Sequence, residues 1–557
     1  DNTEVVIADG VGIIVEGILS IDSATLHSTS GSRWAGISVA GTGSILETSG
    51  SHLVEASQVI TVGEGASITI SNTEVARGDG LLTIGDDTTS SIENSYFHDA
   101  MESCVMGQGT EASISIADAV FDNCGDHAVW VRYADVNIES IILGNGSDEG
   151  LEISAATGVI NGVDASEHGG SRAAVHLSEI DGGLTVSNLN LSATSSAAFI
   201  AEMSRNIDVN HISVIGAPAI ELDFVAGTMS NLDLTGNGSG IGIVAHHSRG
   251  SGALEISESS VAGYSVALEM HGNSGEVYNP RLISSNNIFS GATAVSGDGR
   301  NFVSINDDFS GAIELTSDVE MISEFYDSTY LGISVTGNAS AIIWNTLSFS
   351  ATLDGLPVSA IVSVTSPVSE ETYVSQSSSS PSLIVPVAEY QSSDSSVATS
   401  LMVSATAEGS LPYNSEIIVS ANFSNLLIEM EINSNPVVQL VNPDGDITLM
   451  QTQNLSLIAN ATDANSDKSS LSIEWTITDS TGQQVATSDE WAWWTDELLV
   501  GNYVANVVVM DPHGGDSDTS FIITITQLDS DGDWTETCDQ DLWWDSSQSI
   551  DCGPDDL

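Results

Sequence analysis

One short stretch of the chain gathers residue types that perform chemistry in proteins. The segment IADAVFDNCGDHAVWV contains six such side chains: Asp118, Asp122, Asn123, Cys124, Asp126 and His127. Carboxylates, imidazoles and thiolates are metal ligands, and a carboxylate beside an imidazole can also transfer protons. The stretch therefore raises two hypotheses, a metal or catalytic site and a structural unit that is rich in turn residues.

A second group of polar residues lies later in the chain. Asp307 and Asp308 are adjacent, and Asp298 and Arg300 precede them by a few residues. Pairs of carboxylates cleave glycosidic bonds by acid–base chemistry. A polysaccharide lyase would instead need an arginine or lysine as the base beside calcium. These four residues are the catalytic candidates if the protein is an enzyme.

The short acidic tail, residues 528–557, carries a pattern suited to calcium. In LDSDGDWTETCDQD, Asp529, Asp531 and Asp533 occupy alternating positions around a glycine. Alternate carboxylates on a tight turn can surround Ca²⁺, which is bound by oxygen atoms. The run resembles a thrombospondin type 3 repeat, and this resemblance implies structural Ca²⁺. It departs from an EF-hand, because the glycine and the closing glutamate of that loop are not at the required positions.

The chain has four cysteines. Cys538 and Cys552 flank a short acidic segment and are expected to form a disulfide. Cys104 and Cys124 are 20 residues apart, and a bond between them is left open because disulfide geometry is demanding. Disulfides suit an oxidising, extracellular compartment.

The elements that would position these residues repeat along the chain. When IENSYFHDAMESCVMG is aligned with IADAVFDNCGDHAVWV, Ile92 matches Ile116 and Phe97 matches Phe121. The shared sequence phrase is apolar-x-(Asn/Asp/Ser)-x-x-apolar, followed by a turn and a second short apolar strand. It returns about every 23 residues. The anchors of the second strand are Ile14, Ile37, Ile60, Leu82, Val105, Val129, Leu151, Val175, Phe199, Ile220, Ile241, Val266, Val295 and Ile313. Such a steady period indicates a solenoid.

Each repeat contains short strands rich in Ile, Val and Leu and has no room for a helix as well. We therefore predict an all-β chain in which residues 1–328 form a right-handed parallel β-helix of about 14 coils. This pattern resembles the pectate-lyase-like superfamily. Alternation predicts that Val129 and Val131 face the interior and Trp130 faces solvent. Because every coil needs turn residues at the same place, the repeat favours the structural interpretation of the opening stretch.

Two further domains are expected after the repeat fades. Residues 329–433 alternate as antiparallel strands do, around the Ser-rich loop SQSSSSPS, and predict an immunoglobulin-like β-sandwich. Residues 434–527 resemble PKD and related immunoglobulin-like domains, with Trp475 as the buried strand tryptophan. In that family carboxylates near the strand ends can bind calcium. The resemblance implies Asp463 and Asp511 as Ca²⁺ ligands, with ordinary loop aspartates as the alternative.

The charge of the chain is one-sided. The 77 Asp and Glu residues against 9 Lys and Arg give a formal net charge of −68. Such a surface repels nucleic acid and anionic membranes and suits a salty medium. No stretch reaches the roughly 18 apolar residues of a membrane span, so no membrane insertion is expected in this segment. Because the chain lacks an initial Met and a signal-peptide pattern, we expect a processed segment of a longer secreted protein.

Two functions remain in view. The favoured hypothesis is an extracellular or cell-surface, non-catalytic protein whose rod contacts a glycan or surface proteins, or assembles into a layer or filament, with self-association left open. The order of domains and the acidic composition resemble secreted proteins of marine or halophilic prokaryotes, including archaea. The alternative is a polysaccharide lyase or glycoside hydrolase. The Gly-His-Gly and Arg-Ile-Lys motifs of polygalacturonases are missing, and an acidic surface is poorly suited to binding polyuronates.

Overall fold

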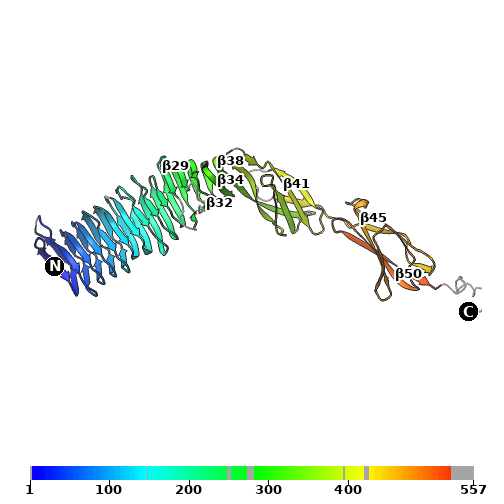
Figure 1. Ribbon diagram of the computed structural model, residues 1–557, viewed down its shortest axis with the longest axis horizontal. Coiled ribbons are helices and arrows are strands. Elements are labelled where there is room, and N and C mark those ends of the chain that lie inside the picture. Colours follow the sequence, from blue (N-terminus) through cyan, green and yellow to red (C-terminus); the bar gives the residue numbers. More distant parts are fainter. Residues whose placement is uncertain are drawn as a thin grey trace, which may run out of the picture. The chain divides into compact units, whose positions relative to one another are not determined.

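The computed structural model contains almost only β-strands (Figure 1). It describes residues 3–29, 31–146, 148–246, 252–272, 281–392, 395–418 and 426–527. The chain divides into two compact units. The first unit consists of Asp1–Thr346 and Val385–Ala398, and the second consists of Leu347–Ile384 and Thr399–Leu557. Within the described ranges, no helix is long and apolar enough to cross a bilayer.

The first unit is a parallel β-solenoid of about 14 turns, as predicted. Its strands pair in parallel with the equivalent strands of the coils before and after. One stack of strands presents an outer surface that we call the β17 face. Its central members are β11 (Gly80–Ile84), β14 (Val105–Gln108), β17 (His127–Arg132), β19 (Glu149–Ser154), β21 (Val175–Ser178), β23 (Phe199–Glu202) and β25 (Ile220–Asp223).

The register along this stack follows the predicted anchors over most of its length. Val105 of β14, for example, pairs with Val129 of β17. The first anchor was wrong by one residue, since Ile13 rather than Ile14 pairs with Ile37. Successive strand residues point to opposite faces, so this slip places Ile14 at the surface, where it is 70% exposed.

Two later anchors were wrong by two residues. Ile220 pairs with Ile243 rather than Ile241, because this coil has 23 residues where the one before it has 21. The next anchor, Val266, carries the same error, because Leu268 is the residue that pairs with both Ile243 and Val295. A shift of two residues keeps the same side chains facing inward, so the alternation alone could not detect it.

A corner with positive φ recurs in each coil, either between two short strands, as at Asn94, or within one longer strand, as at Asn188. Glycine occupies it at Gly50 and Gly162, and the other coils place there Ser23, Asn72, Asn94, Asp118, Ser140, Asn188, His211, Asn231, Glu258, Asn286, Asn306 and Asp327. Among residues with a side chain, Asn and Asp adopt the left-handed conformation most readily. This corner explains why Asn and Asp recur in the shared sequence phrase.

The interior of the solenoid is packed with aliphatic and aromatic side chains. Phe97 and Phe121, which the repeat aligned, stack with their ring centroids 5.4 Å apart. The alternation in β17 is as predicted, with Val129 and Val131 buried and Trp130 partly exposed. Because Val129 and Val131 are buried in the interior, the residues that alternate with them in β17 face outward.

The solenoid continues beyond the predicted boundary at residue 328. Strand β34 (Thr329–Leu353) pairs in parallel with β33 (Asp308–Tyr326) as far as Trp344. Residues 329–344, predicted as part of a sandwich, therefore belong to the solenoid. Alternation is the same in parallel and antiparallel strands, which is why the sequence could not separate them. The hairpin of β38 (Ser382–Gln391) and β39 (Ser395–Val397) pairs with β34 in turn.

The second unit consists of small antiparallel sheets that are consistent with two immunoglobulin-like domains. The first sheet contains β37 (Thr372–Val374), β36 (Ala360–Thr365), β40 (Ser400–Ala407) and β41 (Tyr413–Ile418), while β42 (Leu426–Met430) pairs with the end of β34. The later domain has two sheets. They are β43 (Val437–Asn442), β45 (Leu455–Thr462) and β48 (Ala492–Thr495), and β44 (Ile447–Met450), β50 (Asp516–Thr526), β49 (Gly501–Met510), β46 (Ser472–Asp479) and β47 (Gln484–Ser488). Trp475 is fully buried between these sheets, as predicted.

Candidate functional site

The residues of the opening stretch are mostly structural. Asp118 and Asn123 are corner residues with φ near 51°. Asp122 accepts a hydrogen bond from the backbone N–H of Asn145 in the next coil at 3.1 Å. Cys124 is bonded to Cys104, the pair that the sequence had left open. Among the six residues, His127 stands apart, because it faces outward beside carboxylates of the following coil.

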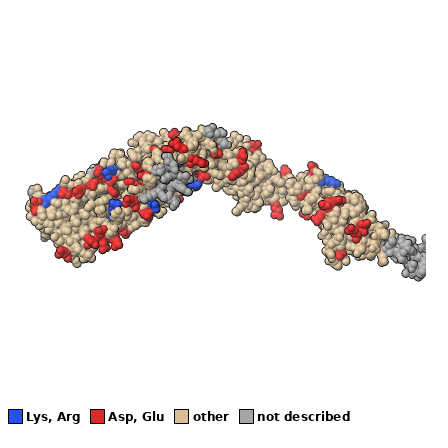
Figure 2. Space-filling view, viewed as in Figure 1, with Lys and Arg blue, Asp and Glu red and all other residues tan. Residues whose placement is uncertain are grey.

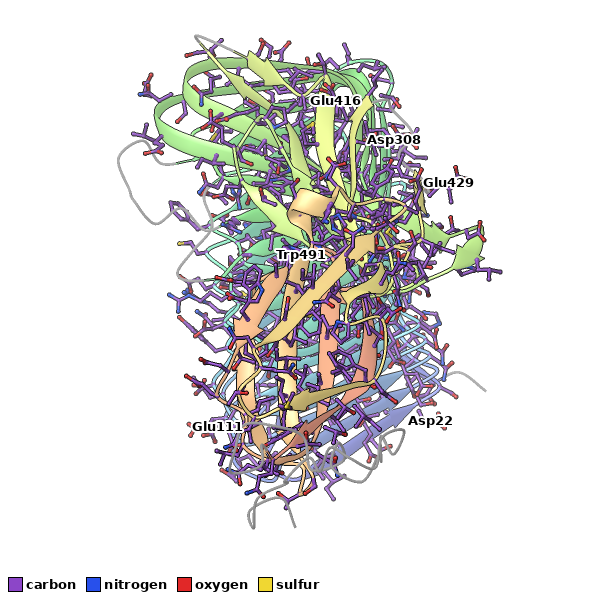
Figure 3. The ribbon with its side chains drawn as sticks, turned by 90° about the vertical axis from the view of Figure 1, so that its right-hand side faces the viewer. Asp22, Glu111, Asp308, Glu416, Glu429 and Trp491 are labelled. Atoms are coloured by element: carbon purple, nitrogen blue, oxygen red, sulfur yellow. A yellow bond between two sulfur atoms is a disulfide. The ribbon has the colours of Figure 1, made fainter. Side chains whose placement is uncertain are left out.

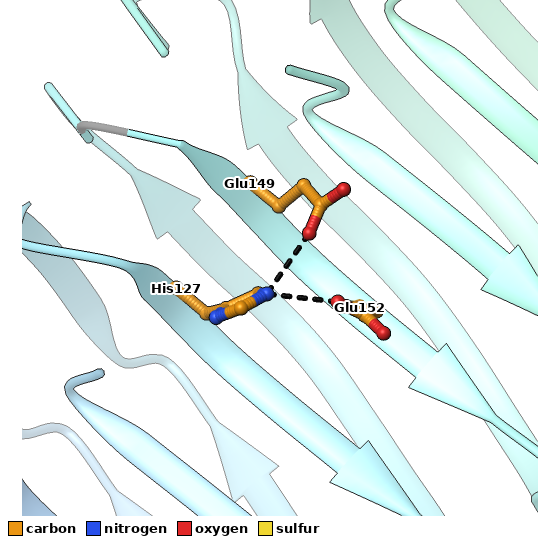
Figure 4. A group of neighbouring side chains, drawn as sticks. All are labelled: His127, Glu149 and Glu152. Carbon is orange, nitrogen blue, oxygen red and sulfur yellow. Dashed lines mark hydrogen bonds and ion pairs between the residues drawn. The ribbon is translucent and has the colours of Figure 1, made fainter. Parts of the chain in front are cut away.

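His127 forms a compact cluster with two glutamates of the β17 face. It begins β17 and pairs in register with Glu149, the first residue of β19. Its Nε2 atom lies 2.9 Å from Glu149 Oε2 and 2.8 Å from Glu152 Oε2 (Figure 4). Figure 4 shows the imidazole directed at both carboxylates. The three atoms lie within 4.8 Å of one another, which makes the group a candidate metal centre among the described residues.

The far atoms of the cluster are also engaged. The His127 Nδ1 atom lies 3.2 Å from a carboxylate oxygen of Asp126. The Trp130 indole N–H donates to Glu152 Oε1 at 3.2 Å. These contacts hold His127 Nδ1 and Glu152 Oε1 on the outside of the cluster, so that His127 Nε2 and Glu152 Oε2 face each other.

Glu149 is the least exposed member, at 5%. Its Oε1 atom lies 3.3 Å from His176 Nδ1 and 3.5 Å from Arg172 Nη1. His176 in turn contacts Glu202 through Nε2 at 2.7 Å. A line of alternating imidazoles and carboxylates therefore runs along the β17 face from β17 to β23.

These contacts determine the protonation of the cluster. Burial opposes the charge of Glu149, but hydrogen bonds from His127 and His176 hold the pKa of Glu149 well below its ordinary value. Burial would lower the pKa of His127, but hydrogen bonds to Glu149 and Glu152 outweigh it and raise that pKa to about 10. The pKa of His176 is raised for the same reason. Without a bound metal the cluster is a charged imidazole between carboxylates, and Glu149 is poorly suited to donate a proton.

The sequence reasoning missed the two glutamates. The sequence aligned His127 with Ser103 of the coil before and indicated no repeating partner, whereas in the structure Ser103 Oγ lies 3.4 Å from His127 Nδ1. Glu149 and Glu152 follow His127 by 22 and 25 residues, which is one coil length. The repeat period was therefore the signal that could have found them, had it been applied forward along the chain.

The four catalytic candidates do not form one site. Asp307 is 1% exposed and accepts hydrogen bonds inside the solenoid from Asn287 N–H at 2.8 Å and Ser304 Oγ at 2.7 Å. Asp308 lies at the surface (Figure 3) and accepts a hydrogen bond from Thr329. Adjacent residues in a strand point to opposite faces, so these two carboxylates cannot act on one substrate.

Asp298 and Arg300 are also separated, because the chain turns at Gly299, which has a φ of 66°. Asp298 is exposed, whereas the Arg300 side chain is 1% exposed. Its Nη1 donates to the backbone oxygens of Ala245 and His246 at 3.2 and 3.1 Å, and burial lowers its pKa to about 10. Arg300 thus supports the solenoid wall from inside and is not placed to bind a sugar.

An open hollow of about 440 Å³ lies at the corner next to the β17 face. Its lining includes Glu111, Tyr133, Asp135 and Thr157. Tyr133 is 44% exposed, and the guanidinium of Arg132 lies 4.6 Å from the centre of its ring. The hollow therefore combines an exposed aromatic ring with two carboxylates and a hydroxyl.

The two calcium candidates of the later sandwich lie in connected loops. Asp511 Oδ1 accepts from the N–H groups of His513 and Gly515, and its Oδ2 accepts from Asn433 Nδ2 at 2.9 Å. Asp463 Oδ1 accepts from the N–H groups of Asn465 and Ser466 at 2.8 Å each. Asn465 donates to the backbone oxygen of Ile432, the neighbour of Asn433. The loops that carry Asp463 and Asp511 therefore both contact the segment at residues 432–433.

Several oxygens in these loops lack a hydrogen-bond donor among the described residues. They are Asp463 Oδ2, Asn433 Oδ1, Asn465 Oδ1 and Ser466 Oγ, and all four atoms are buried. Buried acceptors are normally paired, so a group of this kind indicates a missing partner. Carboxylate, amide and hydroxyl oxygens are the ligands that Ca²⁺ prefers. The predicted residues Asp529, Asp531, Asp533, Cys538 and Cys552 lie outside the described ranges.

Comparison with known proteins gives no family assignment. No family model matches the chain, and no curated protein matches it. Several solved structures are similar over part of the chain, including the following three. The fibronectin(III)-like modules of Clostridium thermocellum CbhA share 15% identity, with 31% of this chain and 80% of that chain covered and a TM-score of 0.17. The DIP-gamma IG1+IG2 structure shares 8% identity, with 32% and 94% covered and a TM-score of 0.13.

The third similar structure is a mutant tailspike protein of E. coli bacteriophage HK620 in complex with a hexasaccharide. It shares 9% identity, covers 74% of this chain and 81% of its own, and has a TM-score of 0.17. TM-scores of this size carry no argument about function. The site must therefore be interpreted from its own residues.

Proposed function

We propose that this chain is a secreted or cell-surface protein without catalytic activity, whose solenoid contacts a glycan. The observation that carries the proposal is the hollow beside Tyr133. Sugars bind to proteins through stacking of their apolar faces on aromatic rings and through hydrogen bonds to carboxylates and hydroxyls. The ring of Tyr133 with Glu111, Asp135 and Thr157 supplies both kinds of contact on an open surface that a polymer can cross.

The charge of the chain selects among glycans. Figure 2 shows Asp and Glu spread over the visible face, with few Lys and Arg. A net charge of −68 repels polyanions unless cations bridge the two surfaces. The proposed ligand is therefore a neutral polysaccharide, or an acidic one held through Ca²⁺. The acidic composition also supports the proposal that the protein acts in a salty extracellular medium.

A direct test measures binding to a panel of neutral and acidic polysaccharides, in high salt with and without Ca²⁺. We expect Tyr133→Ala to weaken binding at least tenfold, because it removes the stacking surface. Tyr96→Ala is the matched control, since Tyr96 is similarly exposed on the solenoid, at 39%, outside the hollow. Equal loss in both variants, or none in either, would refute the assignment of the hollow. Shortening of any polymer would support the lyase or hydrolase alternative instead.

We also propose that Ca²⁺ stabilises the loops of the later sandwich. Asp463, Asp511, Asn433 and Asn465 would supply its oxygen ligands, and the buried oxygens without a donor in these loops support this assignment. Calcium at the tail residues Asp529, Asp531 and Asp533 stays a prediction from the sequence. In this role the ion is structural, and it joins segments that are far apart in the chain.

A further inference from the structure

The three inward atoms of the His127 cluster lie within 4.8 Å of one another, and the nitrogen lies at metal-ligand spacing from both oxygens. Transition metals such as Zn²⁺ bind imidazole nitrogen and carboxylate oxygen at about 2.0–2.2 Å, so neighbouring ligand atoms lie roughly 3 Å apart. His127 Nε2 lies 2.9 and 2.8 Å from the nearest oxygens of Glu149 and Glu152. The two oxygens come from one strand and the nitrogen from the strand beside it. The backbone pairing of β17 and β19 therefore fixes the relative positions of all three ligands.

The outer contacts of the cluster match those of a metal site. A histidine ligand commonly binds a carboxylate through its other ring nitrogen, and ligating carboxylates are held by further hydrogen bonds. His127 Nδ1 lies against Asp126, Glu152 Oε1 accepts from the Trp130 indole, and Glu149 Oε1 contacts His176. In each ligand, one atom points to the centre and the other is held in place.

A second group of histidine and glutamate on the solenoid shows that this arrangement is not a general consequence of the repeat. Glu74 lies between two histidines, but it contacts His52 Nδ1 through Oε2 at 2.6 Å and His98 Nε2 through Oε1 at 3.0 Å. Each of these two nitrogens meets one oxygen of Glu74, in the way that His176 meets Glu149. His127 Nε2 differs, because it meets oxygens of two glutamates at once. This group is an ion-pair ladder, and it provides a natural control for the first.

We infer that His127, Glu149 and Glu152 bind one divalent transition-metal ion of the Zn²⁺ class. One imidazole and two carboxylates suit Zn²⁺, Co²⁺, Mn²⁺ or Fe²⁺, whereas Ca²⁺ is bound by oxygen ligands alone. Three protein ligands leave at least one position for water or an added ligand, as in metal centres that bind substrates. The site lies at the start of β17, whereas Tyr133 follows the end of that strand. It is also independent of the proposed Ca²⁺ site.

Cobalt provides the probe, because Co²⁺ bound by nitrogen and oxygen in a protein absorbs visible light. The untagged full chain, freed of metals and kept in excess Ca²⁺ to saturate sites made only of oxygen, is titrated with Co²⁺ and then with Zn²⁺ as competitor. We expect one equivalent of Co²⁺ to give a visible band that Zn²⁺ abolishes. His127→Ala and Glu149→Gln should each weaken binding roughly 100-fold or more, since each removes a ligand.

Two further variants keep the test decisive if Glu149→Gln fails to fold. Trp130→Phe retains every ligand but removes the hydrogen bond that holds Glu152, so binding should weaken about tenfold. His98→Ala alters the control ladder and should leave binding unchanged. The inference is overturned if the parent chain gives no band in the visible range. It is also overturned if His127→Ala binds Co²⁺ as tightly as the parent chain does.

Discussion

Asp307 offers the sharpest contrast between a catalytic and a structural role. The sequence made it the leading catalytic candidate, but the structure places its carboxylate inside the solenoid. In neighbouring coils, other side chains accept the equivalent hydrogen bond from a backbone N–H group. The N–H of Leu232 donates to Ser259 Oγ at 3.0 Å, and the N–H of Ser259 donates to Asn287 Oδ1 at 2.8 Å. The N–H of Asn287 then donates to Asp307 Oδ1.

Asparagine should therefore replace Asp307 with little cost. Asn287 shows how an amide is accommodated, since its Nδ2 donates to Ser284, and Ser284 pairs in register with Ser304 beside Asp307. Burial also raises the pKa of Asp307, so ionisation in the folded state is disfavoured. A raised carboxyl pKa lowers stability as the pH rises above the unfolded value of about 4, and Asp307→Asn removes this penalty. We expect a change within about 1 kcal/mol at pH 7.

Alanine at the same position should be damaging. Asp307→Ala leaves the buried N–H of Asn287 without an acceptor and removes a partner of Ser304. An unsatisfied buried donor costs about 1–3 kcal/mol, and the lost hydrogen bond from Ser304 adds to it, for a total of about 3 kcal/mol. Asp308→Ala is the matched control, because this neighbour is exposed and loses one surface contact worth at most about 0.5 kcal/mol.

Hydrogen–deuterium exchange over residues 282–330 measures these effects where they occur. A local loss of about 3 kcal/mol should speed exchange roughly 100-fold in Asp307→Ala, since about 1.4 kcal/mol corresponds to a factor of ten. Asp307→Asn and Asp308→Ala should exchange like the parent chain. The structural role would be refuted if the asparagine variant were as unstable as the alanine variant. Loss of an enzymatic activity in a well-folded Asp307→Asn would refute it as well.

Three other predictions concern the remaining contacts. Replacing Cys104 and Cys124 by serine should lower local stability by roughly 3 kcal/mol, from the chain entropy of a 20-residue loop, seen as faster exchange in β13 (Tyr96–Ala100) and β16 (Val120–Cys124). In the metal-free chain the pKa of His127 is raised to about 10. This shift contributes stability that is fully present below about pH 6.5 and is lost as the pH rises through about 10. In His127→Gln, the rate of hydrogen exchange should therefore depend less on pH over this range. Ca²⁺ at about 100 times its dissociation constant should stabilise the later sandwich by roughly 2.7 kcal/mol in calorimetry. Asp463→Ala should abolish the gain, and Asp479→Ala, in an exposed turn, should not.

The solenoid was predictable because its physical cause is periodic. Inward apolar residues and a left-handed corner such as Asn94 or Asp118 recur in every coil, so they leave a period in the sequence. The end of the solenoid was not predictable, since β34 alternates in the same way before and after it leaves the parallel stack. Register errors arose where coils change length, as at Ile243.

The site was less predictable than the fold. Sequence proximity suggested Asp307 with Asp308, but neighbours in a strand face opposite sides. Residues one coil apart are the true neighbours on a solenoid face, as His127 and Glu149 show. Asp463 and Asp511 were predicted as Ca²⁺ ligands through a resemblance to PKD domains, and this stays a prediction. The contact of Asn433 with Asp511 could be recognised only in the folded loops. On a solenoid, the residues that share a site with a given polar residue are therefore found one coil length further along the sequence.

The most direct test of the proposed function follows polysaccharides and the chain together. The purified chain is incubated with neutral and acidic polysaccharides in high salt, with and without Ca²⁺, and both bound fraction and polymer length are recorded over time. A non-catalytic glycan-binding protein should retain at least one polymer at constant length, with retention lost in Tyr133→Ala and kept in Tyr96→Ala. Shortening of any polymer would contradict the absence of catalysis, and no retention across the panel would contradict glycan contact.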